Sequence, residues 1–184
     1  MQQRQQQQNN RGGGRDGRRG GFNRPAREKS EFDSKMVDLA RVARVTKGGK
    51  RFSFRATMVI GDRKGRVGVG VAQGKDVQQA MLKSTNAARK HLITVMLQNA
   101  TIPHLVQFKY HSAVVLIKPA PAGSGVKAGG AVRVIAKLAG IDNITAKLIE
   151  RTGNKLNIAR ATIGALNSLK SQASSTKLQT NPNV

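Results

Sequence analysis

Hydrophobic and polar positions first become periodic near Phe32. An extended run at 41–46 is separated from the next run by residues 47–50, which include the pair Gly48 and Gly49. A glycine pair between two extended runs is typical of a tight β-hairpin, because glycine adopts positive φ without strain. From Phe52 to Ile60 every second residue is apolar, and three of the four residues between them, Ser53, Arg55 and Thr57, are basic or hydroxyl-bearing. This alternation predicts a strand with one buried face and one basic face.

The rest of the first half predicts one more strand and a helix. Residues 61–65 form a turn, and in the strand after it Val67, Val69 and Val71 are expected to point inward while Gly68 and Gly70 point outward. Asp76 is a candidate N-cap with Gln79 as its capping-box partner, and apolar residues follow at helical spacing as far as Met96. The predicted order is β-β-β-α, a three-stranded antiparallel sheet backed by one helix.

The second half predicts a β-α-β-α unit whose first, long extended segment could hold two strands. Residues 105–118 are extended and 119–125 form a loop. A short helix at 131–139 ends at Gly140, a strand follows around 144–148, and Asn157 is a candidate N-cap for the last helix. We therefore expect an α+β protein with domains at 31–100 and 101–170, each with a marginal core that packs on the other.

The two ends of the chain differ from this periodic part. Residues 1–30 are rich in Gln, Arg and Gly and have few aliphatic side chains, which predicts a disordered tail. Residues 171–184, rich in Ser, Gln and Asn, are predicted to form a flexible tail.

Charge changes the picture more than composition does. The chain carries 33 Lys and Arg against 9 Asp and Glu, and residues 32–170 alone have a net charge of +18. Such self-repulsion destabilises a compact state unless a polyanion neutralises it, so nucleic acid is the leading partner and an acidic membrane surface the second. The chain has no Cys, which excludes disulfides and thiolate chemistry, and no apolar run of membrane-spanning length. We expect a cytoplasmic protein.

Catalytic motifs are weak. Residues 68–74 follow a strand as a dinucleotide-binding loop does, but the third glycine comes one residue late, and residues 74–76 lack the Ser or Thr of a P-loop. The glycine-rich stretch 123–130 could hold a phosphate at a helix N-terminus or be a structural loop, and both alternatives stay open. The three histidines and the scattered acids have no metal-ligand or paired-carboxylate spacing. The sequence predicts no enzyme, no cofactor and no metal site.

The predicted hairpin is the sharpest feature, because no acid lies between Asp38 and Asp62. Like charges that face each other across strands are destabilising, so phosphates between them would explain the arrangement. We expect Phe52 and Phe54 to lie beneath the charges. The candidate RNA-binding residues, those of the hairpin, the following turn and two further lysines, are Arg41, Arg44, Thr46, Lys47, Gly48, Gly49, Lys50, Arg51, Phe52, Arg55, Arg63, Lys64, Arg66, Lys118 and Lys127. Two other functions stay open for this chain, a free double-stranded-RNA-binding regulator and a nucleotide-using enzyme.

Three stretches carry a family resemblance. VTKGGKRFSFRATMVIGDRKGRVGVGVA (residues 45–72) resembles the N-terminal domain of the family of small-subunit ribosomal protein five. KPAPAGSGVKAGGAVRVIAKLAGIDNITAK (118–147) and NIARATIGAL (157–166) resemble its C-terminal domain. The resemblance covers residues 31–170 in unbroken order.

This resemblance implies a double-stranded-RNA-binding-like β-β-β-α domain followed by a β-α-β-α domain with a left-handed crossover. It implies a structural role in the small ribosomal subunit, binding to rRNA, support of subunit assembly, and contact with ribosomal proteins four and eight. It further implies that the hairpin lies near the decoding region and the spectinomycin site, that the protein affects translational accuracy, and that the mRNA path is nearby. The substitution Gly48→Val or Gly49→Val should then bend the hairpin and disturb decoding or the spectinomycin response. Ala100 and Val114 stand where the family commonly has a Gly and an Arg.

Overall fold

The computed structural model describes residues 31–150 and 152–177, with side chains up to Leu169. The predicted tail at 1–30 and the last residues of the tail predicted at 171–184 lie outside this range. The residues in this range form two four-stranded sheets. The first contains β1 (Asp33–Thr46), β2 (Gly49–Gly61), β3 (Arg66–Gly74) and β4 (Leu92–Thr94), with helix α1 (Val77–Lys90). The second contains β5 (Val106–Tyr110), β6 (Ala113–Pro119), β7 (Val126–Lys127) and β8 (Ile144–Leu148), with α2 (Gly130–Ala139) and α3 (Lys155–Lys177).

The predicted β-β-β-α order of the first half is confirmed, but the helix is shorter than its apolar spacing suggested. α1 begins after Asp76, which occupies the N-cap position without a side-chain hydrogen bond. Gln79 instead accepts a hydrogen bond from the Lys75 amide at 3.0 Å. The helix ends before His91, and Leu92 pairs with Gly68 as the first residue of β4. Residues 92–94, which the helical spacing had assigned to the helix, therefore form a strand at the edge of β3.

The prediction that Gly68 and Gly70 face outward is wrong. Both glycines lie under α1. A Cβ at Gly70 would overlap the Ser84 carbonyl and the Ala88 backbone, and one at Gly68 would lie against the Ala88 carbonyl. Because side chains alternate along a strand, Val67 and Val69 face the other side, where they join the core of the second half. The absence of side chains at these two positions therefore lets the backbone of α1 approach β3 closely.

The end of β2 that approaches β3 is buried on both faces rather than on one. Ala56, Met58 and Ile60 are buried as predicted, but Thr57 and Val59 between them are also almost completely buried. Val59 belongs to a hydrophobic core that includes Val132 and Leu138 of α2. The second half of the chain therefore covers the face that the alternation had assigned to solvent.

The second half follows the predicted order. The extended segment holds two strands, as the sequence allowed, because β5 and β6 form a hairpin within it. The short strand β7, which was not predicted, pairs in parallel with β8, to which it is connected through α2. The hand of this crossover stays a prediction. α3 begins at Lys155 rather than after Asn157, because the Asn154 side chain accepts hydrogen bonds from the Leu156 and Asn157 amides. It continues through Lys177, into the segment expected to be a flexible tail.

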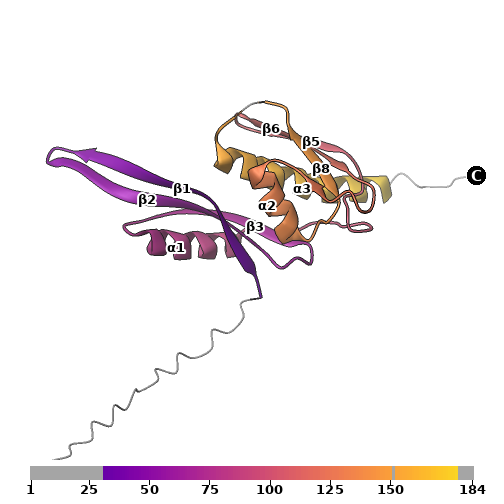
Figure 1. Cartoon of the computed structure of the whole chain (residues 1–184), viewed down its shortest axis with the longest axis horizontal. Helices are drawn as coiled ribbons and strands as arrows, with labels where there is room; N and C mark the ends of the chain where they lie inside the picture. The colour runs from indigo at the N-terminus through magenta and orange to yellow at the C-terminus, as the bar shows by residue number, and fades with distance from the viewer. Residues whose placement is uncertain (1–30, 151, 178–184) are drawn as a thin grey trace, which may run out of the picture. The chain divides into compact units, whose positions relative to one another are not determined.

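The two halves share one hydrophobic core and are joined by backbone hydrogen bonds. The Arg63 and Gly65 amides donate to the Leu138 and Ala139 carbonyls, both at 2.9 Å. At Gly140, which ends α2 with φ of 79° as predicted, a Cβ would overlap the Arg63 backbone. The turn between β2 and β3 is thereby fixed against the end of α2 (Figure 1).

Asn99 and Ala100, in the connection between the halves, both have positive φ, 50° and 60°. They connect the bridge partners Gln98 and Thr101. Such a turn favours glycine at its second central position. The Ala100 carbonyl accepts hydrogen bonds from the Asp142 and Asn143 amides.

No helix among the residues described is both long and apolar enough to span a bilayer.

Candidate nucleic-acid interface

The β1–β2 hairpin extends past the end of α1 and brings most of the predicted RNA-binding residues to one place (Figure 1). The strands pair from Asp33 opposite Gly61 to Thr46 opposite Gly49, so Lys47 and Gly48 form the turn. Gly49 has φ of 123°, and the Thr46 hydroxyl donates to its carbonyl at 3.1 Å. Gly48 has ordinary backbone angles and open space around it. Contrary to the expectation, only Gly49 is required by the backbone conformation.

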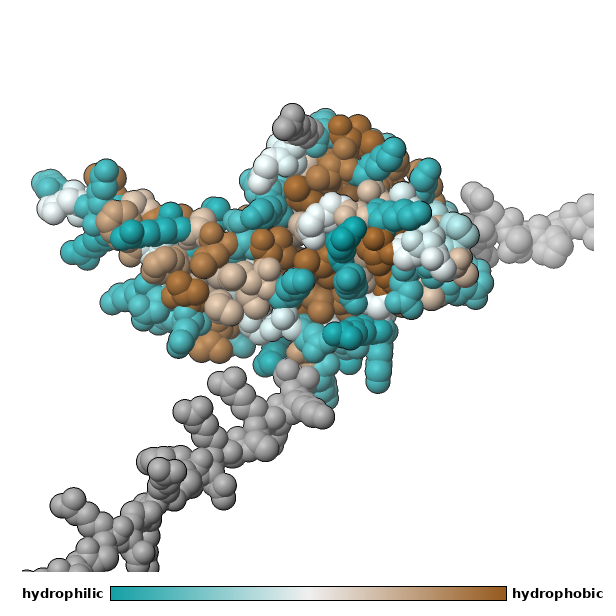
Figure 2. All heavy atoms as spheres, in the orientation of Figure 1, coloured by the Kyte–Doolittle hydropathy of each residue, from teal (hydrophilic) through white to brown (hydrophobic). Residues whose placement is uncertain are grey.

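The register divides the basic residues of the hairpin between two faces. Arg44 lies directly opposite Arg51, and Ala40 lies opposite Arg55, so these three arginines share one face. Arg41 and Lys50 lie on the other face, which continues toward α1. We call this whole set, with Lys47 at the turn, the hairpin cations: Arg41, Arg44, Lys47, Lys50, Arg51 and Arg55. Around the end of the hairpin, Figure 2 shows hydrophilic spheres with a few hydrophobic ones among them.

The prediction that Phe52 lies beneath the charges is wrong, because its side chain is 51% exposed. The Arg41 guanidinium lies over its ring, 3.9 Å from the ring centroid. α1 does not reach this part of β2, so no helix of the described residues covers the end of the hairpin (Figure 1), and Phe54 is only half-buried. The end of the hairpin therefore offers an exposed aromatic ring and an arginine plane besides charge.

The hairpin cations have no carboxylate partners within the described part of the chain. The four ion pairs found there join Arg63 to Asp33, Arg66 to Asp62, Lys109 to Glu150 and Lys155 to Asp38. The Nε of Arg55 is enclosed and also has no hydrogen-bond partner. Since Arg44 faces Arg51 across the strands, the hairpin has a concentration of positive charge that the described residues do not neutralise.

The turn between β2 and β3 holds Arg63, Lys64 and Arg66 at the other end of β2. The strand has 13 residues, which corresponds to about 40 Å at the usual rise per residue. Asp33 pairs with Arg63 at 2.8 Å, and Asp62 pairs with Arg66 at 2.6 Å. The predicted residues therefore form two separate groups, and two of the three cations in this turn are already paired.

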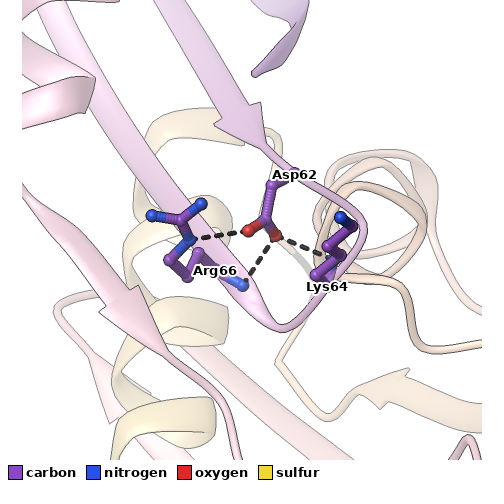
Figure 3. A network of polar contacts seen from close by, with 3 residues as sticks. All are labelled: Asp62, Lys64 and Arg66. Carbon is purple, nitrogen blue, oxygen red and sulfur yellow. Dashed lines mark hydrogen bonds and ion pairs between the residues drawn. The ribbon is translucent and has the colours of Figure 1, made fainter. Parts of the chain in front are cut away.

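Asp62 organises this turn (Figure 3). Its side chain is 5% exposed, and it accepts hydrogen bonds from the Lys64 amide, the Arg66 amide and the Arg66 Nε. Burial raises the pKa of this carboxyl, but the hydrogen bonds from the Arg66 side chain and from the Lys64 and Arg66 amides outweigh it. The pKa of Asp62 consequently lies below its usual value, and the carboxylate stays ionised.

Lys118 and Lys127 lie on the second sheet, in a third group. Both pair in register with Thr145, Lys118 from β6 and Lys127 from β7, so the three side chains form a row on one face. Lys147 and Lys109 share that face, which is opposite the one packed on α2 and α3. These two lysines are not among the predicted residues, although alternation along each predicted strand would have placed them there.

The glycine-rich stretch before α2 makes structural hydrogen bonds. The Gly125 amide donates to the Asn143 side chain at 3.1 Å, and its carbonyl accepts from the Ile144 amide. Positive φ at Gly123 and Gly125 shapes the loop. These contacts favour the structural alternative, in which the glycines allow β7 to pair with β8.

An α+β protein with unpaired positive charge on an exposed hairpin belongs to the class of nucleic-acid-binding proteins. Within this class, residues 32–96 match the family "Ribosomal protein S5, N-terminal domain", and residues 108–179 match "Ribosomal protein S5, C-terminal domain". The chain belongs to the ribosomal protein S5 family.

Curated relatives agree with this assignment. The chain is 44% identical over 142 residues to the "Small ribosomal subunit protein uS5" of Campylobacter jejuni subsp. jejuni serotype O:23/36 and to that of serotype O:6. In both cases the alignment covers 77% of this chain and 96% of the relative. The resemblance inferred from the three sequence stretches is thereby confirmed.

Proposed function

We propose that this protein is a structural constituent of the small ribosomal subunit that binds its rRNA. The observation that carries the proposal is the β1–β2 hairpin, whose six cations have no carboxylate partner among the described residues and include Arg44 facing Arg51. Phosphates placed along the two faces would neutralise this charge, because arginine and lysine side chains bind the phosphate oxygens of a nucleic-acid backbone. The family is one of ribosomal proteins, so we assign this chain a structural role and not a catalytic one.

The finer parts of the proposal concern location and partners. The hairpin lies near the decoding region and contributes to translational accuracy, close to the path by which mRNA enters. Ribosomal proteins four and eight are its protein neighbours, and the ribosome that contains it is cytoplasmic. Residues 31–100 and 101–170 act as the two domains of the protein, and the tails at 1–30 and 171–184 lie outside them.

The mode of RNA binding follows from the side chains. Arginine and lysine side chains contact phosphate oxygens without reading the sequence, so the hairpin reads the shape of RNA and its backbone. Phe52 and the Arg41 plane above it add one place where an unpaired base can stack. With about 8–10 phosphates engaged over the whole protein, the logarithm of the binding constant should fall with log salt at a slope of about −6 to −9.

The test replaces Arg44 and Arg51 together with Gln and measures binding of the full chain to purified bacterial small-subunit rRNA across a salt series. The loss of two phosphate contacts should weaken binding by about tenfold or more near 0.1 M salt and make the salt slope shallower by about 2. The matched control replaces Arg89 and Lys90, two exposed cations in the last turn of α1 that are outside the predicted site. Equal losses in both double variants would show that net charge, not the hairpin, determines binding.

Sedimentation separates this proposal from the alternatives. The endogenous protein should migrate with small subunits and remain there after a high-salt wash. A protein that stays free while binding double-stranded RNA would instead be a regulator. ATP or GTP turnover by the pure protein would support a nucleotide-using enzyme and contradict the proposal.

A further inference from the structure

The basic face of the hairpin changes its chemistry where β2 begins to pair with β3. Toward the turn of the hairpin, Arg44 lies opposite Arg51, so two cations face each other. Beside β3, the cross-strand neighbours of Arg55 are Ala40 on β1 and Gln73 on β3. Residues directly opposite each other on antiparallel strands have Cβ atoms about 5 Å apart, so one ligand can reach both long side chains of this row. Arg55 therefore stands next to a neutral amide instead of a second cation.

The guanidinium of Arg55 is held in place and presents its outer nitrogens. The side chain is half-buried, and its Nε is enclosed without a hydrogen-bond partner. The two Nη atoms are not enclosed, and they make no hydrogen bond or ion pair with the described residues. Asp38, two residues from Ala40 on β1, pairs with Lys155 at 3.3 Å. The packed stem thus restricts the orientation of two forked donors that the described residues leave unpaired.

Gln73 places an acceptor beside these donors. Its side chain is exposed and makes no hydrogen bond with the residues that the structure describes. A glutamine amide presents a carbonyl oxygen besides its NH2 group, whereas arginine has donors alone. The phosphate of an RNA backbone offers acceptors, so it suits Arg44 and Arg51 but leaves the Gln73 carbonyl without a partner. The ligand that matches this row has acceptors and a donor side by side.

We propose that Arg55 and Gln73 together read the edge of an unpaired guanine. Guanine presents the acceptors N7 and O6, and the N1–H donor follows O6 around the ring. The Arg55 fork donates to N7 and O6, which is the commonest base-specific contact of arginine, and the Gln73 carbonyl accepts from N1–H. Adenine carries an amino donor in place of O6 and does not match the fork. Because base pairing occupies N1–H, the guanine is in a single-stranded segment.

This inference rests on the proposed rRNA binding and deepens it. The other hairpin cations contact the backbone without regard to sequence, and this row adds a preference for one base. The test therefore measures preference between bases apart from total affinity. The probes are a short oligoadenosine, the same oligonucleotide with one central guanosine, and a third with 7-deazaguanosine, which lacks the N7 acceptor. We expect the full chain to bind the guanosine probe about tenfold more tightly than either of the others, as a bidentate base contact does.

Two substitutions remove the two halves of the contact. Arg55→Lys keeps the charge but removes the fork, so the preference for guanosine should fall to within about twofold while the affinity for oligoadenosine is kept. Gln73→Leu removes one hydrogen bond at an exposed position and should reduce the preference about threefold. The matched control is Arg51→Lys, the same change on the same face opposite Arg44, which should leave the preference intact. Circular dichroism checks that each variant is folded, and the exposed position of Gln73 allows the test even if Arg55→Lys disturbs β2.

The outcomes distinguish this inference from the proposed function. Equal affinity for the three probes, with salt-sensitive binding to small-subunit rRNA retained, would refute guanine reading and leave the proposed function standing. A wild-type chain without salt-sensitive rRNA binding would contradict the proposed function itself. A preference that survives Arg55→Lys would place the base contact elsewhere and overturn the assignment to Arg55. Guanosine monophosphate should not displace the guanosine probe at equal concentration, since it lacks the neighbouring phosphates, and displacement would assign the site to a free nucleotide instead of RNA.

Discussion

Asp62 shows how a single carboxylate can hold a turn between two strands. It accepts hydrogen bonds from two backbone amides and from the Arg66 guanidinium, and its own side chain is almost fully buried. Asp33, by contrast, pairs with Arg63 in an exposed position. Hydrogen bonds to a buried charged group contribute more to stability than an exposed ion pair does. Asp62 is therefore expected to contribute more to the stability of the folded protein than Asp33.

The substitution Asp62→Asn should lower the free energy of unfolding at pH 7 by about 1–2 kcal/mol, since it removes a charged acceptor from three hydrogen bonds. Because the folded-state pKa of Asp62 is below its unfolded value, its stabilising effect is complete above the unfolded pKa and is lost as the pH falls through the folded one. The difference between wild type and variant should thus shrink in acid. Urea unfolding at a series of pH values measures this. Asp33→Asn, the control, should change stability by less than about 0.5 kcal/mol at any of them, and an equal effect of both substitutions would contradict the argument.

At the scale of elements, the packing of α1 on the first sheet depends on strand positions without side chains. Gly70 lies against Ser84 and Ala88, which are both fully buried. The substitution Gly70→Ala should therefore destabilise the protein by about 3 kcal/mol, because the neighbouring atoms are helix backbone and cannot rotate away. Gly48→Ala, at a position with no heavy atom within 4 Å and no left-handed φ, should change stability by less than about 0.5 kcal/mol. Thermal unfolding followed by circular dichroism compares them, and similar melting temperatures for both variants would show that α1 can shift.

Most elements could be predicted from the sequence, but not every face that they bury. Alternation from Phe52 to Ile60 predicted β2 correctly, yet alternation reveals one buried face, and Thr57 and Val59 are buried by the second half of the chain. Spacing of three and four residues continued past His91, where pairing with Gly68 forms β4 instead of more helix. In each case a contact distant in sequence decided between two local patterns.

The same reason separates the predictable from the unpredictable part of the site. The hairpin cations and the tight turn follow from the residues themselves. Sequence could not show that Asp33 neutralises Arg63, because the two residues are brought together by strand pairing. Nor could it show that Gln73 lies beside Arg55, because the register between β2 and β3 decides which residues are neighbours.

For the whole molecule, the unpaired charge predicts that stability depends on anions. The chain has a net charge of +24, and its described residues form few ion pairs. Repulsion among these cations acts over the Debye length, which is about 30 Å at 0.01 M salt and about 8 Å at 0.15 M. Raising the sodium chloride concentration between these values should therefore raise the melting temperature. At the lower salt, inorganic polyphosphate at about 100 times its dissociation constant should raise it by roughly 5–10 °C, because a ligand that binds the folded state stabilises it by about 2.7 kcal/mol at that concentration. Spermine, a polycation, serves as the control and should give no increase. Melting temperatures that are equal in all four solutions would mean that the fold already balances its own charge, and that RNA is bound by a rigid protein rather than needed to stabilise it.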